Sequence, residues 1–274
     1  MTRVVYVNGR YLPYAQAGVH VEDRGLQFAD AIYEVCEVRD GALVDRTRHM
    51  ERLERSLGEL GIRQPMSRAA LSIVLAETVR RNRVRTGLVY LQITRGAAPR
   101  DFPFPRGDVA PTVVCLARSL DSAARETRAS AGIAVATMPD TRWARCDIKT
   151  VMLLPAVLAK EAAGKVGAQE AWFVDRDGFV TEGASSNAWI LDKDGALITR
   201  ALGPELLPGV TRRTLLDLLA REKIPLIERP FRVEEATAAR EAFVTSAFGL
   251  VMPVVKINGV AIGDGHPGEL TRRL

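Results

Sequence analysis

The chain has 274 residues, of which 47% are hydrophobic and 26% charged, with a formal net charge of +5 and a pI near 9.3. This length accommodates one large or two ordinary domains, and no apolar run is long enough to cross a bilayer, which argues against a membrane-spanning protein. The basic residues are scattered among 33 acidic ones and aromatics make up only 6%, so the composition disfavours nucleic-acid binding and favours an anionic small molecule.

Cysteine usage and the N-terminus indicate a compartment. Three widely spaced cysteines, Cys36, Cys115 and Cys146, fit neither a disulfide framework nor a zinc site. The first residues, "MTRVVYVNGRY", lack the apolar core of a signal peptide. We therefore expect a cytoplasmic protein without a metal site.

The first half of the chain predicts an α+β domain. Its Asn-Gly and Asp-Gly pairs are strong hairpin signals, and leucines at helical spacing follow them. The expected elements are strands around 8–9 and around 40–41, helices at 46–60 and 67–83, and strands at 87–96 and 111–118.

The second half predicts a larger, sheet-rich domain. Residues 119–130 carry few large apolar side chains and are expected to connect two domains. We expect an N-terminal domain over 1–118, the linker over 119–130 and a C-terminal domain over 131–274. The expected elements of the second domain are a strand at 132–138, a helix ending near 164, strands at 170–175 and 179–192, a helix at 209–223 and strands within 241–259.

Lysine usage singles out one residue. Only six of the 38 Lys+Arg residues are lysines, and the first of them, Lys149, stands in "RCDIKTVMLLP". Arginine stays charged in a protein, whereas lysine can become an amine nucleophile that forms a Schiff base with an aldehyde. The apolar flank "TVMLLP" is expected to exclude water from this amine. An ordinary surface lysine is the competing interpretation.

A carboxylate with an unusual setting follows 33 residues later. Glu182 lies in "VTEGASSN", an apolar strand that runs into a bend. Such a carboxylate usually points to solvent. The functional interpretation is a carboxylate that keeps the pyridinium nitrogen of a cofactor protonated, so that the ring acts as an electron sink.

Two segments look like anion-binding loops. "LPGVTRR" places Gly209, Val210 and Thr211 where a helix begins, so that free backbone N–H groups and a hydroxyl converge. "VTSAFG" offers Ser246 and small neighbours at the end of a strand. Either segment, taken singly, is also explained as a simple helix cap or loop.

A helical wheel selects one arginine of the 46–60 helix. At about 100° per residue, Arg52 lies at the edge of the apolar stripe, whereas Arg48 and Arg55 lie near the opposite side. Arg52 is therefore the arginine we expect to point inward toward a phosphate. An arginine that covers a helix flank with its aliphatic stem is the alternative.

Taken together, these segments resemble fold-type IV pyridoxal-phosphate enzymes, and among them the D-amino acid aminotransferases more than the branched-chain ones. The similarity covers nearly the whole chain in order. It runs through "VEDRGLQFADAIYEV", "HMERL", "YLQITRGAAPR", "TRWARCDIKTVMLLPAVLAKEA", "VTEGASSN", "LLPGVTRR", "FVTSA" and "VVKINGVAIGDG". The resemblance implies a two-domain α+β fold, with a smaller N-terminal domain, a larger pseudo-barrel domain and pyridoxal 5'-phosphate between them.

The resemblance also implies roles for individual residues. Lys149 matches the Schiff-base lysine and Glu182 the partner of the ring nitrogen. The residues implied to bind the cofactor around them are Arg52, Leu207, Val210, Thr211, Ser246 and the Ala247 position. The residues implied to bind the substrate are Tyr33, Val35, Arg100 and the Phe102 position.

Two positions depart from the family pattern. Phe102 stands where the D-specific enzymes have a histidine, so the group that binds the α-carboxylate has lost a donor, and Arg24 in the "DRG" loop is a candidate substitute. Ala247 stands where a threonine is frequent, which removes one hydrogen bond to the phosphate. Neither departure affects Lys149 or Glu182.

The activity implied is amino-group transfer from a D-amino acid such as D-alanine to a 2-oxo acid, pyruvate or 2-oxoglutarate. A homodimer is also implied, because family pockets are completed by a loop of the partner. Alternatives of the same fold are a branched-chain L-aminotransferase, an (R)-amine transaminase and aminodeoxychorismate lyase. A cofactor-free Schiff-base aldolase would be colourless and would not need the anion loops, and a basic binding module would bind DNA with steep salt dependence.

Overall fold

The computed structural model describes residues 3–274 and divides into two compact units. The first comprises the residues up to Ser122 together with Ile148–Met152, and the second comprises Ala123–Asp147 and Leu153–Leu274. The predicted N-terminal domain starts with two residues, 1–2, that lie outside the described residues. The predicted linker contains a helix, α4 (Ser122–Ala131), which has no buried residue.

The first unit is a six-stranded sheet with the strand order β2-β1-β6-β5-β3-β4, and each neighbouring pair is antiparallel. The hairpin and helix predictions for this half are confirmed. Its elements are β1 (Val4–Val7), β2 (Arg10–Pro13), the short 3-10 helix η1 (Tyr14–Gln16), α1 (Arg24–Phe28), β3 (Ala31–Arg39), β4 (Ala42–Leu43), α2 (Arg46–Glu59), α3 (Arg68–Arg81), β5 (Gly87–Thr94) and β6 (Val113–Ser119).

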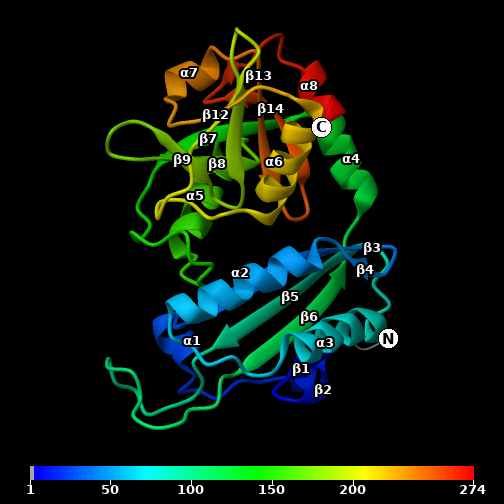
Figure 1. Cartoon of the computed structure of the whole chain (residues 1–274), viewed down its shortest axis with the longest axis vertical. Coiled ribbons are helices and arrows are strands. Elements are labelled where there is room, and N and C mark those ends of the chain that lie inside the picture. Colours follow the sequence, from blue (N-terminus) through cyan, green and yellow to red (C-terminus); the bar gives the residue numbers. More distant parts are fainter. Residues whose placement is uncertain (1–2) are drawn as a thin grey trace. The chain divides into compact units, whose positions relative to one another are not determined.

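One face of this sheet is covered by α2 and α3 (Figure 1). Side chains alternate between the two faces along β3 and β5, so every second residue is buried under these helices. The core therefore includes Cys36 and Val38 of β3 with Val89 and Leu91 of β5. Residues such as Tyr33 and Val35 lie on the other face and are only half-buried.

The second unit is a nine-stranded mixed sheet with the order β12-β11-β10-β13-β14-β7-β8-β9, to which β15 adds at β14. The predicted strands and the helices near 164 and at 209–223 are confirmed. Its further elements are β7 (Ile133–Pro139), α5 (Leu154–Lys165), β8 (Glu170–Val174), β9 (Val180–Gly183), β10 (Asn187–Leu191), β11 (Leu197–Thr199), α6 (Val210–Glu222), β12 (Leu226–Glu228), α7 (Val233–Thr237), β13 (Glu241–Ser246), β14 (Leu250–Ile257), β15 (Val260–Ala261) and α8 (Glu269–Arg273).

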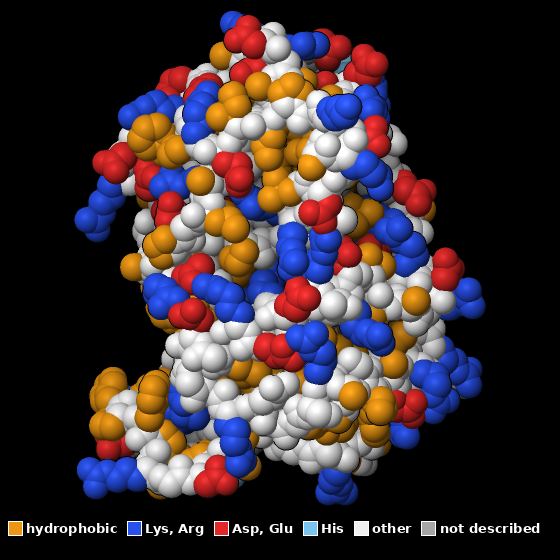
Figure 2. All heavy atoms as spheres, viewed as in Figure 1, with side chains coloured by type: hydrophobic (Ala, Val, Ile, Leu, Met, Phe, Trp, Pro, Cys, Tyr) orange, Lys and Arg blue, Asp and Glu red, His pale blue; other side chains and the backbone are white. Residues whose placement is uncertain are grey.

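Positive and negative side chains are interspersed over the face drawn in Figure 2, as the scattered charges of the sequence indicated. No helix of the described chain is long and apolar enough to cross a membrane.

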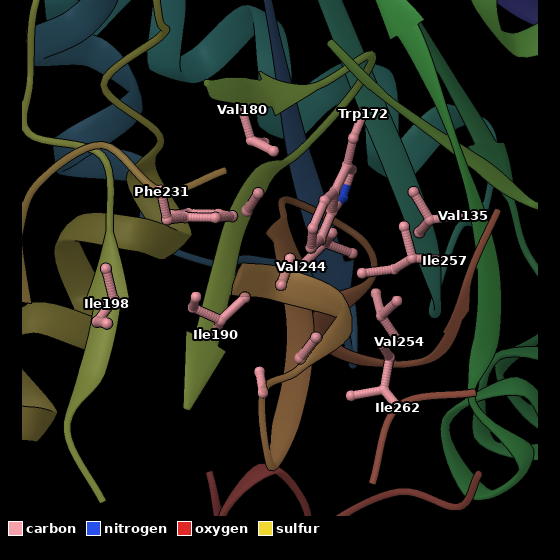
Figure 3. Close-up of a cluster of buried hydrophobic side chains, with 14 of the residues drawn as sticks. Val135, Trp172, Val180, Ile190, Ile198, Phe231, Val244, Val254, Ile257 and Ile262 are labelled. Carbon is pink, nitrogen blue, oxygen red and sulfur yellow. The ribbon is translucent and has the colours of Figure 1, made fainter. Parts of the chain in front are cut away.

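Inside the second unit, side chains from β7, β8, β10, β13 and β14 converge on one apolar core (Figure 3). Trp172 is fully buried there and meets Phe231 edge to face, with ring centroids 6.1 Å apart. Two further clusters lie under helices: α6 covers Trp189 and Phe243, and α5 covers Phe173. β9 and β10, with the bend between them, are thus packed on a rigid core.

Candidate active site

The main chain at Lys149 is fixed by pairing with β3. β4 pairs with only the last two residues of β3, Val38 and Arg39. The first residues of β3 pair instead with the chain around Lys149, through a bridge between Ile32 and Thr150. The N–H of Tyr33 donates to the carbonyl of Lys149 at 3.0 Å, and the N–H of Val151 donates to the carbonyl of Ala31 at 3.2 Å. This pairing explains why Ile148–Met152 belong to the first unit.

The side chain of Lys149 lies on the half-buried face of the first sheet. Its Nζ atom is 4.3 Å from the centroid of the Tyr33 ring, and Tyr33 stacks on Tyr90 with centroids 5.6 Å apart. Val35, which pairs with Tyr90 across the strands, shares this face. Burial, together with the neighbouring Tyr33, raises the pKa of Tyr90 to about 12. The structure thus brings Lys149, Tyr33 and Val35 together, and it adds Tyr90, which sequence reasoning missed.

Arg52 is buried, as the helical wheel predicted, and its partner is Glu34. Its Nε and Nη2 atoms donate to the two Glu34 oxygens at 2.8 Å each, and His49 Nδ1 lies 2.7 Å from Glu34 Oε2. Burial disfavours the charged carboxylate, but the charge and hydrogen bonds of Arg52, with those of His49, outweigh it and lower the pKa of Glu34 to about 2. Sequence reasoning missed Glu34 and His49, although both stand at buried positions of predicted elements.

Arg100 and Phe102 lie on the loop between β5 and β6. Phe102 is 79% exposed, and the Arg100 guanidinium carbon lies 5.2 Å from the Phe28 ring and 5.8 Å from the Phe102 ring. Phe102 therefore supplies a ring face to Arg100 in place of a hydrogen-bond donor.

Arg24 does not have the role considered for it from the sequence. Its side chain is buried, and its Nε atom donates to Asp30 at 2.8 Å. Its Nη1 atom donates to the carbonyl of Asp101 at 2.7 Å, and longer contacts reach the next two carbonyls. These partners occupy the guanidinium, so the expectation that Arg24 replaces the missing carboxylate donor is wrong in this conformation.

In the second unit, Glu182 is buried and surrounded by donors. Arg142 Nη1 donates to its Oε1 atom. Asn187 Nδ2 and the N–H of Leu207 donate to its Oε2 atom at 3.1 and 3.0 Å. Glu182 therefore does not point to solvent, and its role toward a cofactor stays a prediction. Sequence reasoning missed Arg142, although "TRWARCDIK" lies within the quoted segments.

Arg142 is itself held in place on several sides. It also donates to Asp140, Thr181 and the carbonyl of Glu205. Burial alone would lower the pKa of Arg142, but the hydrogen bond to Asp140 and the charge of Glu182 raise it.

The two anion-binding loops of the sequence meet at one place. The Thr211 hydroxyl at the start of α6 donates to the carbonyl of Ser246 at 3.0 Å, and Ser246 Oγ accepts from the N–H of Gly249 at 3.0 Å. Gly209 is the N-cap of α6 and provides no capping side chain, so the first N–H groups of the helix are directed outward. Ala247 directly follows Ser246 in this turn.

The chemistry of these donors fits a phosphorylated pyridinium. The uncapped start of α6 and two hydroxyls suit a phosphate, and the buried Glu182 suits a protonated ring nitrogen. Leu207 connects Glu182 with the start of α6. Its N–H donates to Glu182, and it lies two residues before Gly209. A side chain at Gly209 would not fit, because a Cβ atom there would lie 2.2 Å from Asn187 Oδ1.

Comparisons with known proteins agree with this arrangement. Residues 31–257 match the family model described as amino-transferase class IV. The chain is 41% identical over all 274 residues to a D-alanine aminotransferase of Staphylococcus haemolyticus, of which it covers 95%, and 37% identical over 270 residues to that of Bacillus licheniformis, of which it covers 94%.

Solved structures show the same fold. A branched-chain amino acid aminotransferase of Escherichia coli superposes with a TM-score of 0.91 at 23% identity, covering 100% of this chain and 92% of its own. A second branched-chain amino acid aminotransferase, from T.th. and solved with pyridoxamine 5'-phosphate, gives 0.89 at 22% identity, with coverage of 100% and 92%. The fold and the site define an aminotransferase of fold type IV. The chain belongs to the class IV aminotransferase family.

Proposed function

We propose that this enzyme is a D-amino acid aminotransferase that uses pyridoxal 5'-phosphate to move the amino group of a D-amino acid, such as D-alanine, to pyruvate or 2-oxoglutarate. The observation that carries the proposal is the 41% identity to a D-alanine aminotransferase over the entire chain. The similarity to branched-chain enzymes is lower, at 22–25% identity, and supports the fold alone.

The residues of the second unit would hold the cofactor. Val210, Thr211 and Ser246, with the Ala247 turn, would bind its phosphate, and Leu207 would lie against its ring. Arg52, which the resemblance implies for the phosphate, donates to Glu34, and its part in binding the phosphate stays a prediction. When bound, pyridoxal phosphate supplies an aldehyde that takes up the amino group and a ring that withdraws electrons.

Two residues would handle the protons. Lys149 would hold the cofactor through its amine, and the same amine would take up and release the proton of the substrate Cα. Glu182, which accepts a hydrogen bond from Arg142, would hold a proton on the ring nitrogen. The Tyr33 ring beneath the Lys149 amine would orient it during both transfers.

The substrate carboxylate would be bound by Arg100 and Tyr33. Arg24 donates to loop carbonyls and Phe102 offers no donor, so we assign to Arg100 the two-point contact with the carboxylate. Val35 would face the substrate side chain. This assignment favours D-amino acids over amines that lack a carboxylate.

A second copy of the chain is part of the proposal. Leu154, Val157 and Leu158 lie at helical spacing on α5 and are 66%, 57% and 60% exposed. Exposed apolar side chains on one helix face are typical of an interface. Light scattering is expected to give twice the mass of 30.0 kDa, and Leu158→Glu is expected to shift the protein toward monomer.

An absorption spectrum with two substrates tests the assignment. The purified protein is expected to show a band near ~410–420 nm that D-alanine removes and L-leucine does not. Lys149→Ala is expected to lose both the band and turnover, whereas Lys165→Ala, an exposed lysine, is expected to keep them. Loss of the band with L-leucine alone would reassign the enzyme to the branched-chain class. A protein that stays colourless after addition of pyridoxal phosphate would exclude the proposal.

A further inference from the structure

The loop between β5 and β6 has no helix or strand of its own, so its backbone depends on other groups for hydrogen bonds. We call residues 96–111 the Arg100 loop. Buried or half-buried carbonyls need donors, and a loop this long without secondary structure usually has a function. Phe102 and Phe104 of this loop are exposed. Figure 1 places the loop at the lower left, where Figure 2 shows hydrophobic and basic side chains next to each other.

One side chain supplies donors to three successive carbonyls of this loop. Arg24 Nη1 lies 2.7 Å from the carbonyl oxygen of Asp101 and 3.4 Å from that of Pro103, and Nη2 lies 3.4 Å from that of Phe102. The first is a good hydrogen bond and the other two are longer. Arg24 is only 3% exposed, so water cannot easily replace it.

The guanidinium of Arg24 is itself held by the carboxylate of Asp30. Asp30 accepts from Arg24 Nε at 2.8 Å, and the same carboxylate accepts from Arg95 Nε and Nη2 at 2.7 and 3.0 Å. Arg95 also donates to the carbonyls of Leu60 and Gly61, which anchors it to the end of α2. All these groups lie within the first unit, so the loop is tied to the sheet and to α2 through one buried carboxylate.

Ring contacts extend this anchoring to the side chains of the loop. The Arg95 guanidinium carbon lies 3.7 Å from the centroid of Phe104, and that of Arg24 lies 4.6 Å from the centroid of Phe28. Phe28 contacts Phe102 with centroids 5.7 Å apart, and both rings face Arg100. The guanidinium of Arg100 therefore rests on rings whose positions are set by Arg24 and by the loop backbone it holds.

We propose that Arg24 is a positioning residue: linked through Asp30 to Arg95, it holds the Arg100 loop in one conformation and thereby presets Arg100 for the substrate carboxylate. The second half of this statement rests on the proposed function. It assigns to Arg24 an indirect effect on substrate binding, through the loop, and no contact with the substrate.

Limited proteolysis tests the anchoring without substrate. Trypsin is expected to cut the bond between Arg100 and Asp101 about tenfold faster in Arg24→Gln than in the wild type, because local opening sets the cleavage rate. Arg24→Lys keeps the charge beside Asp30 but cannot reach three carbonyls at once, so it is expected to lie in between. Mass spectrometry of the initial fragments gives the rate.

The matched control is Arg63→Gln. Arg63 pairs with Asp108 of the same loop at 2.8 Å, but both side chains are exposed, so its loss is expected to leave cleavage after Arg100 within about twofold. Circular dichroism melting shows which variants are folded, and Arg24→Lys serves if Arg24→Gln is not. Equal cleavage rates in the wild type and a folded Arg24 variant would overturn the anchoring.

Steady-state kinetics test the consequence for the substrate. Arg24→Lys is expected to raise KM for D-alanine about tenfold while kcat stays within about threefold. The reason is that the contact of Arg100 with the substrate carboxylate is displaced, whereas Lys149 is not. An unchanged KM despite faster cleavage would overturn the link from the loop to the substrate. A wild type that does not convert D-alanine would contradict the proposed function, and the cleavage rates would still decide the role of Arg24.

Discussion

Tyr33 fixes Lys149 at two levels. Its N–H donates to the Lys149 carbonyl at 3.0 Å, and its ring lies 4.3 Å from the Lys149 Nζ atom. One strand residue therefore contacts both the main chain of Lys149 and its amine. Because β3 is paired with β5 from Ala31 to Val38, the position of Tyr33 is fixed by the sheet.

Substitutions of Tyr33 separate its hydroxyl from its ring. Tyr33→Phe keeps the ring under Lys149 and removes a donor to the substrate, so KM for D-alanine is expected to rise about three- to tenfold with kcat within about twofold. Tyr33→Leu also removes the cation–π contact, about 0.5–2 kcal/mol, and is expected to lower kcat as well. Tyr14→Phe, at an exposed tyrosine outside this site, is the control and should leave KM unchanged. The same KM in Tyr33→Phe and the wild type would rule out the hydroxyl as a substrate donor.

The buried pair of Glu34 and Arg52 makes a prediction about stability. Glu34→Gln leaves the Arg52 guanidinium buried without its counter-charge, so the free energy of unfolding is expected to fall by about 3–5 kcal/mol. Glu34→Gln combined with Arg52→Met removes both charges and is expected to recover part of this loss. Urea unfolding at pH 7 measures both. Glu77→Gln, at a partly exposed helix carboxylate paired with the exposed Arg80 and Arg81, is the control and should change little. A loss as small as that of the control would show that the pair does not stabilise the fold.

The lowered pKa of Glu34 predicts how stability depends on pH. A carboxyl whose pKa falls from 4.5 to about 2 on folding adds stability that is complete above the unfolded pKa and is lost as the pH drops toward 2. The contribution lost between about pH 5 and pH 2 is about 3 kcal/mol. The Glu34→Gln/Arg52→Met variant should lose correspondingly less over this range. Parallel pH profiles for the wild type and this variant would contradict the assignment.

The elements of the fold were predictable because their signals are local. Turn pairs and leucine spacing lie within a few residues, so the hairpins at 8–9 and 40–41 and the burial of Arg52 followed from the sequence. Its partner Glu34 did not, because a buried ion pair between a helix and a strand depends on which face of the strand meets the helix. The placement of Ile148–Met152 on β3 joins segments more than a hundred residues apart, and no local pattern encodes it.

Arg24 shows the same limit for a functional residue. The sequence showed it only as an arginine of the "DRG" loop, a candidate to replace the donor lost at Phe102. The number of carbonyls that a guanidinium meets depends on the path of the loop between β5 and β6. Only the folded loop distinguishes an arginine that binds a ligand from one that binds the backbone.

The contact between Gly209 and Asn187 gives a prediction about cofactor affinity. A Cβ atom at Gly209 would lie 2.2 Å from Asn187 Oδ1, so Gly209→Ala must displace the amide that donates to Glu182 and to the carbonyl of Leu207. The displacement also shifts the start of α6, which we expect to bind the phosphate. The dissociation constant for pyridoxal phosphate is therefore expected to rise at least about tenfold, because one charge-assisted hydrogen bond contributes about 1.5–3 kcal/mol.

Equilibrium titration of the apoenzyme, followed by absorbance, measures this change. Gly58→Ala is the control, because a Cβ atom at this position of α2 meets nothing within 4 Å, and it should leave the affinity unchanged. Asn187→Ala added to Gly209→Ala removes the clash but not the loss of the Glu182 donor. If Gly209 affects cofactor binding through the Asn187 amide, the double variant should bind pyridoxal phosphate no better than Asn187→Ala alone. Wild-type affinity in Gly209→Ala would instead mean that Asn187 can move without disturbing Glu182, and the close approach at this glycine would have no part in cofactor binding.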